Sequence, residues 1–513
     1  MTERPPSFAD FLNGLGPRFL PFADAATREL PLARLLRLAL FQMTVGMAAV
    51  LLAGTLNRVM IVELFVPAWL VSVMIALPLL FAPFRALVGH RSDQHLSHLG
   101  WRRVPFIWIG TMLQFGGLAI MPFALILLAG SGTGGPVWIG HVGAAVAFLL
   151  VGAGMHTTQT AGLALATDLA PPDARPRVVA LLYVMLLVGM VVSSLVFGLL
   201  LADYSHMALV RCVQGAAVVT FAVNLIALWK QEPRAPQRTG LDRPRVAFGE
   251  AWGRLREKGR VTRMLVALGI GTAAFNMQDV LLEPYGAEVL GLSVSGTTTL
   301  TAIFSAGMLL GFAYAAQHLA RSSDAAFGKI SANHAADGGA AHAAARALGE
   351  AVGRARPYRL AGKGCLVGLV AFAAVIFAGP LESPGLFRVG AGLIGVGSGL
   401  FSVAMLVAAM ALARSEDTGI VIGAWGAVQA TSAGVAIALG GILRDAASAA
   451  GVSGALGPAF TDHAIGYSVV YHLEIGLLFV ALVALGPVLG YIQNSTAETA
   501  PADDGFGLTH FPG

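Results

Sequence analysis

Long apolar segments alternate with short polar connections along almost the whole chain. A helix that crosses the hydrocarbon core of a bilayer needs about 20 mostly apolar residues, so each segment predicts one membrane span. Six spans precede a charged stretch from Lys230 to Arg263, and six follow it. The predicted spans are Leu38–Leu56, Ala68–Leu87, Val104–Leu128, Val137–Leu165, Val178–Leu201, Ala208–Leu228, Met264–Leu282, Thr297–Leu319, Gly364–Ala378 (the shortest), Leu386–Ala413, Gly419–Ile442 and Gly466–Ile492.

The positive charges of the connections predict how these spans are oriented. With the N-terminus in the cytoplasm, all but four of the 33 Lys and Arg residues fall on the cytoplasmic side. The four exceptions are Arg58, Arg211, Arg388 and Arg444. Cytoplasmic connections carry an excess of Lys and Arg. We therefore expect both termini in the cytoplasm and an even number of spans.

Composition agrees with a membrane protein. Only 12% of the residues are charged and 56% are hydrophobic, and the mean hydropathy is +0.74. Soluble domains are about 25% charged, so most of this surface must face lipid, and no nucleic-acid partner is expected. The sequence predicts an all-α membrane protein of twelve helices in two six-helix halves, a layout found in many transporters.

The predicted organisation has six parts. A cytoplasmic N-terminal segment contains an apolar face formed by Phe8, Phe11, Leu12 and Leu15, which predicts a short amphipathic helix. An Ala- and Gly-rich stretch around Ser331–Ala345 has few large apolar residues, and we expect a mobile insertion or a partial helix there. The parts are the N-terminal segment 1–37, the first bundle 38–230, the linker 231–263, the second bundle 264–492, its insertion at about 320–362 and the tail 493–513.

The connection between the second and third spans resembles the signature loop of the major facilitator superfamily. That loop has a glycine, an acid four residues later and then a basic cluster. The chain departs from the pattern by the additional residues Gln94 to Leu99. The resemblance implies a twelve-helix major facilitator fold. The matching residues are Gly89, Arg91, Asp93, Gly100, Arg102 and Arg103.

Longer motifs resemble the PucC/LhaA family, the bacteriochlorophyll delivery branch of this superfamily. They are residues 54–64, 82–93, 100–108 and 278–286, and the similarity runs from about Phe8 to Pro512. The resemblance implies a non-enzymatic factor that assembles light-harvesting antenna complexes in the bacterial inner (intracytoplasmic) membrane. It also implies bacteriochlorophyll as cargo, with antenna polypeptides and reaction-centre components as partners.

Two polar groups at span ends are candidate cleft or gate residues. Asn57, Arg58 and Glu63 end the first span, and Gln278, Asp279 and Glu283 end the seventh. Asp279 and Glu283 are four residues apart, so they share a face of a regular helix. In a facilitator fold these two spans line the central cleft, where Arg58 is expected to pair with Asp279 or Glu283. The groups serve either as a structural lock of the periplasmic gate or as contacts for pigment or a partner.

A histidine in the fourth span is the candidate pigment ligand. His156 lies in an apolar, Gly-rich run, and a neutral imidazole is a common metal ligand. The alternative is a histidine hydrogen-bonded inside the bundle. His318 and His472 have the same ambiguity, but they lie nearer to span ends.

Three functions remain open from the residues alone: an assembly factor, a transporter of a small solute or tetrapyrrole, and a structural subunit. No nucleophile motif, phosphate-binding loop or strong metal-ligand spacing occurs. The most prominent acids lie near span ends, and mid-span positions are mostly Gly, Ala, Leu and Val. This distribution favours a hydrophobic cargo over a polar solute. Gly395 and Gly399 in the tenth span predict close helix packing.

Overall fold

Every regular element in the described part of the chain is a helix. The computed structural model describes residues 30–80, 92, 101–130, 136–171, 174–232, 259–333, 340–412, 418–457, 461–462 and 464–497. In lipid, no water is available for backbone N–H and C=O groups, so a spanning segment must satisfy them internally as a helix.

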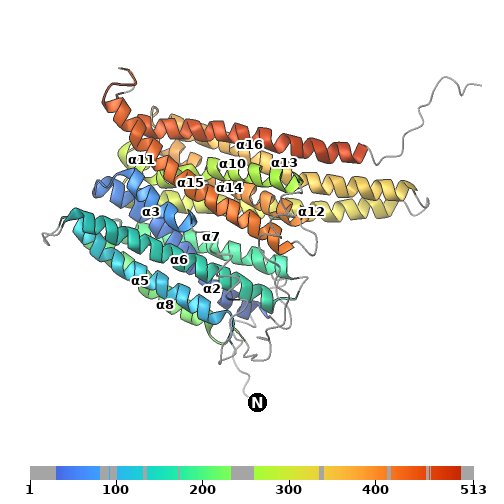
Figure 1. Cartoon of the computed structure of the whole chain (residues 1–513), viewed down its shortest axis with the longest axis horizontal. Helices are drawn as coiled ribbons and strands as arrows, with labels where there is room; N and C mark the ends of the chain where they lie inside the picture. The colour runs from blue at the N-terminus through green and yellow to red at the C-terminus, as the bar shows by residue number, and fades with distance from the viewer. Residues whose placement is uncertain are drawn as a thin grey trace, which may run out of the picture.

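Two bundles follow one another along the chain (Figure 1). The first contains α2 (Leu32–Ala49), two π-helical segments η2 (Val50–Leu56) and η3 (Val59–Glu63), α3 (Ala68–Leu80), α5 (Val104–Leu128), α6 (Val137–Leu169), α7 (Arg175–Leu200) and α8 (His206–Leu228). The second contains α10 (Gly259–Asn276), the 3₁₀ turn η5 (Met277–Val280), α11 (Leu282–Glu288), α12 (Val294–Asn333), α13 (Ala340–Ala378), α14 (Pro384–Leu412), α15 (Thr418–Val452) and α16 (Ile465–Ala497).

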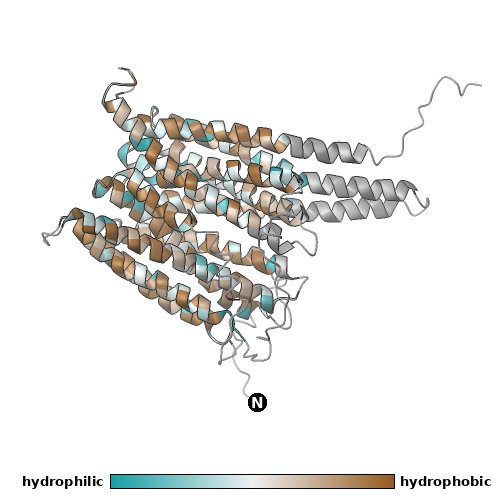
Figure 2. Cartoon of the chain, in the orientation of Figure 1, coloured by the Kyte–Doolittle hydropathy of each residue, from teal (hydrophilic) through white to brown (hydrophobic). Residues whose placement is uncertain are grey.

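Eleven described helices are long and apolar enough to cross a membrane, and Ala68–Leu79 is a shorter apolar helix in the position of the second span. Most positions along the described helices are hydrophobic (Figure 2). Large exposed examples are Phe123, Trp138, Leu199, Val370 and Val483. Such a surface is suited to lipid, so the predicted membrane fold is confirmed.

Several predicted boundaries differ from the structure, including the end of the eleventh span, since α15 continues to Val452 rather than ending at Ile442. The first span covers Leu32–Glu63, and the ninth covers Arg356–Ala378 rather than Gly364–Ala378. In the insertion, α12 continues to Asn333 and α13 begins at Ala340. Alanine is the strongest helix former, so an Ala-rich sequence extends these helices beyond the apolar segments. The expected partial helix is therefore correct for most of Ser331–Ala345.

Glycines set the close approach of neighbouring helices. A Cβ added at Gly395 would lie 2.0 Å from the Phe304 carbonyl oxygen, and one at Gly399 would lie 2.6 Å from the Met308 carbonyl oxygen. Both contacts are with the backbone of α12, which cannot move aside as a flexible side chain does. The predicted close packing of the tenth span is confirmed.

The two bundles meet along α3 with α15 and along α7 with α12. Three hydrogen bonds join them in the described part of the chain: Thr55 with Thr298, Asn57 with Val280, and Trp69 with Asp445. All three lie at the end of the bundle where α2 finishes and α3 starts. The opposite end holds both the start of α2 and the end of α16 (Figure 1). The chain therefore crosses the bundle an even number of times, and the assignment of the joined end to the periplasm stays a prediction.

Several predicted features lie outside the described residues. These are the amphipathic segment before residue 30, Gly89, Arg91, Asp93 and Gly100 of the signature loop, most of the linker, and the tail after residue 497.

Candidate functional site

The end of the first span is π-helical at two places, over Val50–Leu56 and Val59–Glu63. π-Helical turns are rare and frequent at functional sites. Arg58 is 4% exposed, and its Nη1 atom lies 2.5 Å from Oε1 of Glu63. The ion pair of Arg58 is therefore with Glu63 of the same span, whereas Glu283 lies near enough to Arg58 for an electrostatic interaction without an ion pair in the described structure. In a π-helix the hydrogen bonds join residues i and i+5, so Arg58 and Glu63, which are five residues apart, lie on one side of the helix. In a regular α-helix they would point in different directions.

A tyrosine from the loop between α7 and α8 approaches this ion pair. Burial, together with the Glu63 carboxylate, raises the pKa of Tyr204 to about 12. The phenol therefore stays protonated at physiological pH and adds no charge to the site.

The first and seventh spans do face each other, as predicted. The Asn57 amide donates to the carbonyl oxygen of Val280 at 2.9 Å. Gly54 lies against Glu283, because a Cβ at Gly54 would be 2.6 Å from Oε1 of that carboxyl group. Glu283 is 2% exposed and accepts a short hydrogen bond from Thr301 of α12. These contacts join the two halves at the end of the bundle where α2 finishes and α3 starts.

The seventh span is broken where these contacts occur. α10 ends at Asn276, a 3₁₀ turn covers Met277–Val280, and α11 starts at Leu282. Asp279 and Glu283 therefore belong to different elements, and the expectation that they share one face of a regular helix is wrong. The Asp279 carboxylate instead accepts from the Gln278 amide at 2.6 Å.

A buried acid in the last span was missed by the sequence analysis. Glu474 of α16 is 0% exposed. No described side chain hydrogen-bonds its carboxyl group, and the backbone of Gln278 lies beside it. Glu474 lies close enough to Asp279 to interact with it electrostatically. The sequence analysis placed the most prominent acids near span ends, whereas Glu474 is nine residues from the start of α16. Its mid-span position was the available signal, since ionisable residues there mark function.

A cluster of polar side chains closes the same end of the second bundle. Arg444 of α15 forms ion pairs with Glu288 and Asp445, and it donates to the Tyr467 hydroxyl at 3.0 Å. Asp445 also accepts from the backbone N–H of Trp69, in the first turn of α3, at 2.8 Å. An acid at a helix N-terminus is stabilising. This Arg444 cluster therefore fixes the start of α3 to the second bundle.

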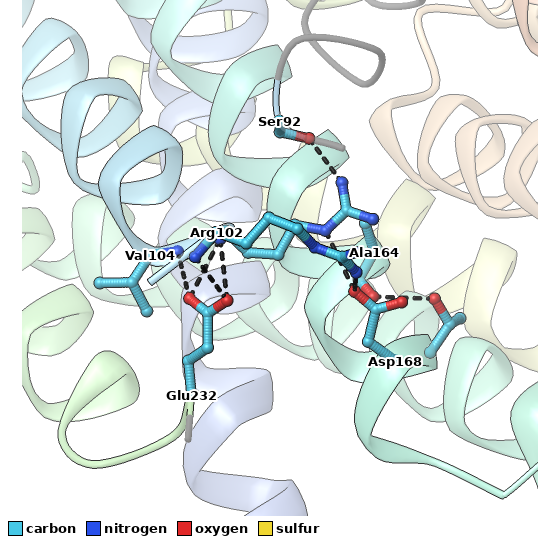
Figure 3. Close-up of polar contacts among 8 residues, drawn as sticks. Ser92, Arg102, Val104, Ala164, Asp168 and Glu232 are labelled. Carbon is cyan, nitrogen blue, oxygen red and sulfur yellow. Dashed lines mark hydrogen bonds and ion pairs between the residues drawn. The ribbon is translucent and has the colours of Figure 1, made fainter. Parts of the chain in front are cut away.

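Arg102 and Arg103 of the signature loop form a network at the opposite end (Figure 3). Both guanidinium groups pair with Asp168, the last acid of α6, at 2.5 and 3.1 Å. Arg103 also donates to the Ser92 hydroxyl at 2.6 Å. Through these contacts the two arginines connect Ser92, the start of α5 and the end of α6. This is a structural role.

Glu232, which follows α8, completes this network from below the first turn of α5 (Figure 3). Its carboxylate accepts from the backbone N–H groups of Arg102, Arg103 and Val104 at 2.8–3.0 Å. The first N–H groups of a helix have no partner within it. Glu232 supplies those partners together with the favourable charge. Nothing in the sequence identified Glu232, because it follows the sixth span whereas α5 is the third span. The two segments are far apart along the chain.

His156 lies on α6, on the side turned away from α5. The side that packs on α5 carries Gly154 and Thr158, whereas His156, Thr160 and Thr167 repeat with helical spacing on another face. All three are half-buried. The Thr160 hydroxyl donates to the carbonyl oxygen of His156 at 2.7 Å. His156 is therefore partly accessible along a polar face, and it is not enclosed in the core.

The other histidines named as candidates are exposed. His318 stacks on Tyr314 of α12 with ring centroids 5.8 Å apart, and His472 lies on the outside of α16. Among the described residues, no group of three or more His, Cys, Asp and Glu side chains is placed to hold a metal ion.

The PUCC protein family matches residues 55–336 and 339–492 of this chain. The chain belongs to the PucC family. It is 54% identical over 438 residues to Protein PucC of Rhodovulum sulfidophilum, with 84% of this chain and 89% of that protein covered. It is 48% identical to an uncharacterized protein of the puhA–bchM intergenic region of Rhodobacter capsulatus, with 98% of each covered. The 44.5 kDa chain of bacteriochlorophyll synthase of Rhodobacter capsulatus is 27% identical, with 89% of this chain and 95% of that protein covered.

Solved transporter structures share the fold of this PucC-family chain. A point mutant of the peptide transporter POT, in complex with sulfate, has a TM-score of 0.60 at 13% identity, with 89% of this chain and 95% of that chain covered. A bacterial homolog of the lysosomal transporter Spinster, inward-facing and unoccupied, has a TM-score of 0.58 at 13% identity, with 91% of this chain and 98% of that chain covered. At this identity the likeness concerns the fold alone. The chain is thus a multi-pass membrane protein with a major facilitator fold, consistent with the bacterial inner membrane.

Proposed function

We propose that the protein is a non-enzymatic assembly factor that binds bacteriochlorophyll and delivers it to the polypeptides of light-harvesting antenna complexes. The observation that carries this proposal is membership of the PucC family over most of the chain. The name of one relative, a chain of bacteriochlorophyll synthase, adds the pigment. The partners of this function are antenna polypeptides, reaction-centre components and the lipid membrane.

The physical case begins with the pigment. A large apolar macrocycle with a long tail is poorly soluble in water, so it must move between proteins within the membrane. A bundle with an apolar, lipid-facing exterior offers it van der Waals contact. The two halves join at one end through Asn57, Val280 and Glu283, and these residues act in the proposal as a gate. His156 is the magnesium ligand that we propose within the bundle, because it is half-buried on a polar face of α6.

The test is gentle purification of the full chain from phototrophic membranes, followed by its absorbance spectrum. We expect bacteriochlorophyll or antenna polypeptides to accompany the protein. His156→Phe should lower bound pigment without lowering the protein level, whereas the matched variant His141→Phe, on the same helix but near its other end, should not. Unchanged pigment in His156→Phe would overturn the ligand assignment. Absence of both pigment and antenna chains, with normal antenna levels in a strain lacking the protein, would overturn the function.

A second candidate function, proton-coupled transport of a small solute or tetrapyrrole, is favoured by Glu474. A fully buried carboxyl group with no partner of opposite charge is unfavourable when charged, so the group is suited to hold a proton. Its neighbour Asp279 lies at the break of the seventh span, and broken helices are sites of coupling ions in transporters. Proteoliposomes with an imposed pH gradient separate the two functions. Solute uptake that is lost in Glu474→Gln and retained in the exposed control Glu382→Gln would support transport.

A further inference from the structure

One titratable side chain, so far named only as an alternative pigment-ligand candidate, lies on the lipid-facing surface of a span. His472 is exposed on α16, seven residues from the start of that helix at Ile465. At 1.5 Å of rise per residue, it lies about 10 Å along the helix. The Arg444 cluster, which includes Tyr467, is about 7 Å nearer to the helix start. His472 therefore lies deeper in the membrane than the polar residues that close this end.

The neighbours of His472 on the outer face of α16 are apolar. Val469 and Leu473 are exposed large hydrophobic residues, and Phe479, Val480 and Val483 continue this apolar surface further along the helix. Histidine within a membrane span is rare, and when present it almost always faces the bundle interior or a water-filled cavity. An imidazole that faces lipid is an exception, and a functional role is the default hypothesis for it.

The hydrogen bonding of the ring determines its tautomer. The Nδ1 atom of His472 lies 2.7 Å from the Ser468 carbonyl oxygen, which can only accept. Nδ1 must therefore carry the proton and donate it. The Ser468 hydroxyl is also near Nδ1, at 3.3 Å. In the neutral ring the other nitrogen, Nε2, then carries a free lone pair, and it has no partner in the described structure. Donation from one ring nitrogen to a backbone carbonyl is the usual arrangement of a metal-ligating histidine, because it fixes the ring and raises the basicity of the ligating nitrogen.

The helix surface beside the ring is open. Gly476 follows His472 by one helical turn and shares its face. A Cβ added at Gly476 would have no atom within 4 Å. A flat macrocycle bound at Nε2 would extend over neighbouring positions of the helix, and glycine at this position leaves room for it.

We propose that His472 is a lipid-facing axial ligand for the magnesium of a bacteriochlorophyll, and that Gly476 provides the clearance for the macrocycle. This inference rests on the proposed function, and it adds a pigment site on the outer surface of the second bundle, separate from His156. Pigment held there is open to lipid and to an antenna helix that approaches α16 from the side. Ligation from Nε2 forms one coordination bond and releases no proton.

The test compares two pigments on the full-length protein in lipid nanodiscs. The probes are bacteriochlorophyll and its magnesium-free counterpart, which no axial ligand can hold. The protein carries His156→Phe, so that magnesium-dependent binding at that site does not contribute, and the unsubstituted protein is measured in parallel. We expect the magnesium pigment to bind more tightly than the magnesium-free pigment. Adding His472→Leu should weaken the binding of the magnesium pigment by more than about tenfold and should leave the binding of the magnesium-free pigment unchanged. About tenfold is the lower end of the affinity loss seen when even an outer partner of a metal ligand is removed.

A second variant keeps the imidazole and blocks the space. Gly476→Leu should weaken the binding of both pigments. The control Gly486→Leu, at an equally open position further along α16, should weaken the binding of neither. If His472→Leu keeps the preference for magnesium, or if Gly476→Leu and Gly486→Leu behave alike, the site on α16 is overturned while the proposed function stands. If the unsubstituted protein binds neither pigment, both the site and the proposed function are overturned.

Discussion

A single methyl group should separate the two halves where α3 packs against α15. Gly441 of α15 packs against α3 of the other half, and a Cβ added there would lie 2.0 Å from the Ser72 hydroxyl and 2.7 Å from the Ala68 carbonyl oxygen. Ser72 cannot rotate away without loss, because its hydroxyl bonds the carbonyl oxygens of Ala68 and Trp69 at 2.8 and 3.0 Å. Gly441→Ala must therefore separate α3 from α15.

The magnitude follows from the contact. Ordinary van der Waals contact begins near 3.4 Å, so α3 and α15 must move apart by roughly 1.4 Å, a shift that overpacking by one methyl group commonly forces at a cost of about 1–3 kcal/mol. This cost applies only while the halves are joined. Since about 1.4 kcal/mol is a tenfold change in an equilibrium, we expect the open arrangement to become roughly 5- to 140-fold more populated.

The assay measures access to the buried interface between the halves. Thr298 is 0% exposed and contacts Thr55 across that interface. In a protein whose two native cysteines are replaced, Thr298→Cys is treated with a membrane-impermeant maleimide added outside spheroplasts. Gly441→Ala should raise the labelling rate in proportion to the open population. Gly426→Ala is the matched control on α15, because a Cβ at Gly426 would meet no atom within 4 Å. Equal rates in Gly441→Ala, Gly426→Ala and the parent would refute the reasoning.

Three further predictions follow from other contacts. Arg58→Ala should lower antenna levels more than Arg388→Ala, because Arg58 is buried and paired with the partly exposed Glu63, whereas Arg388 is exposed. Equal antenna spectra in the two mutant strains would contradict this. Glu232→Gln should lower thermal stability in detergent by about 1–2 kcal/mol, as expected for a helix N-terminus that loses its acidic partner, and the exposed control Glu382→Gln should leave it unchanged. Reporter fusions at Met1 and Gly513 should show cytoplasmic activity, and periplasmic activity at either end would exclude the predicted orientation.

The sequence by itself determined the membrane fold, and it located the eleven described helices that can cross a membrane together with the shorter apolar helix in the second position. Twenty apolar residues in a row leave a chain few alternatives in lipid, because each backbone polar group must be satisfied within its own helix. The charged stretch after Leu228 divided the spans into two sets, and the structure has two bundles at that division. Gly395 and Gly399 predicted close packing because small side chains are what allow helix backbones to approach. The family resemblance, carried by contiguous motifs, was confirmed by the PucC relatives.

Only the tertiary structure decided which polar residues meet. The partner of Arg58 depends on a π-helical turn, and the separation of Asp279 from Glu283 depends on a break in the seventh span. Neither departure from α-helical geometry has a strong sequence signature, because both are stabilised by contacts with other spans. Glu232 at the start of α5 and Asp445 at the start of α3 come from spans distant in sequence. Local patterns fix which segments are helices, whereas the pairing of single polar side chains depends on how the helices pack in three dimensions.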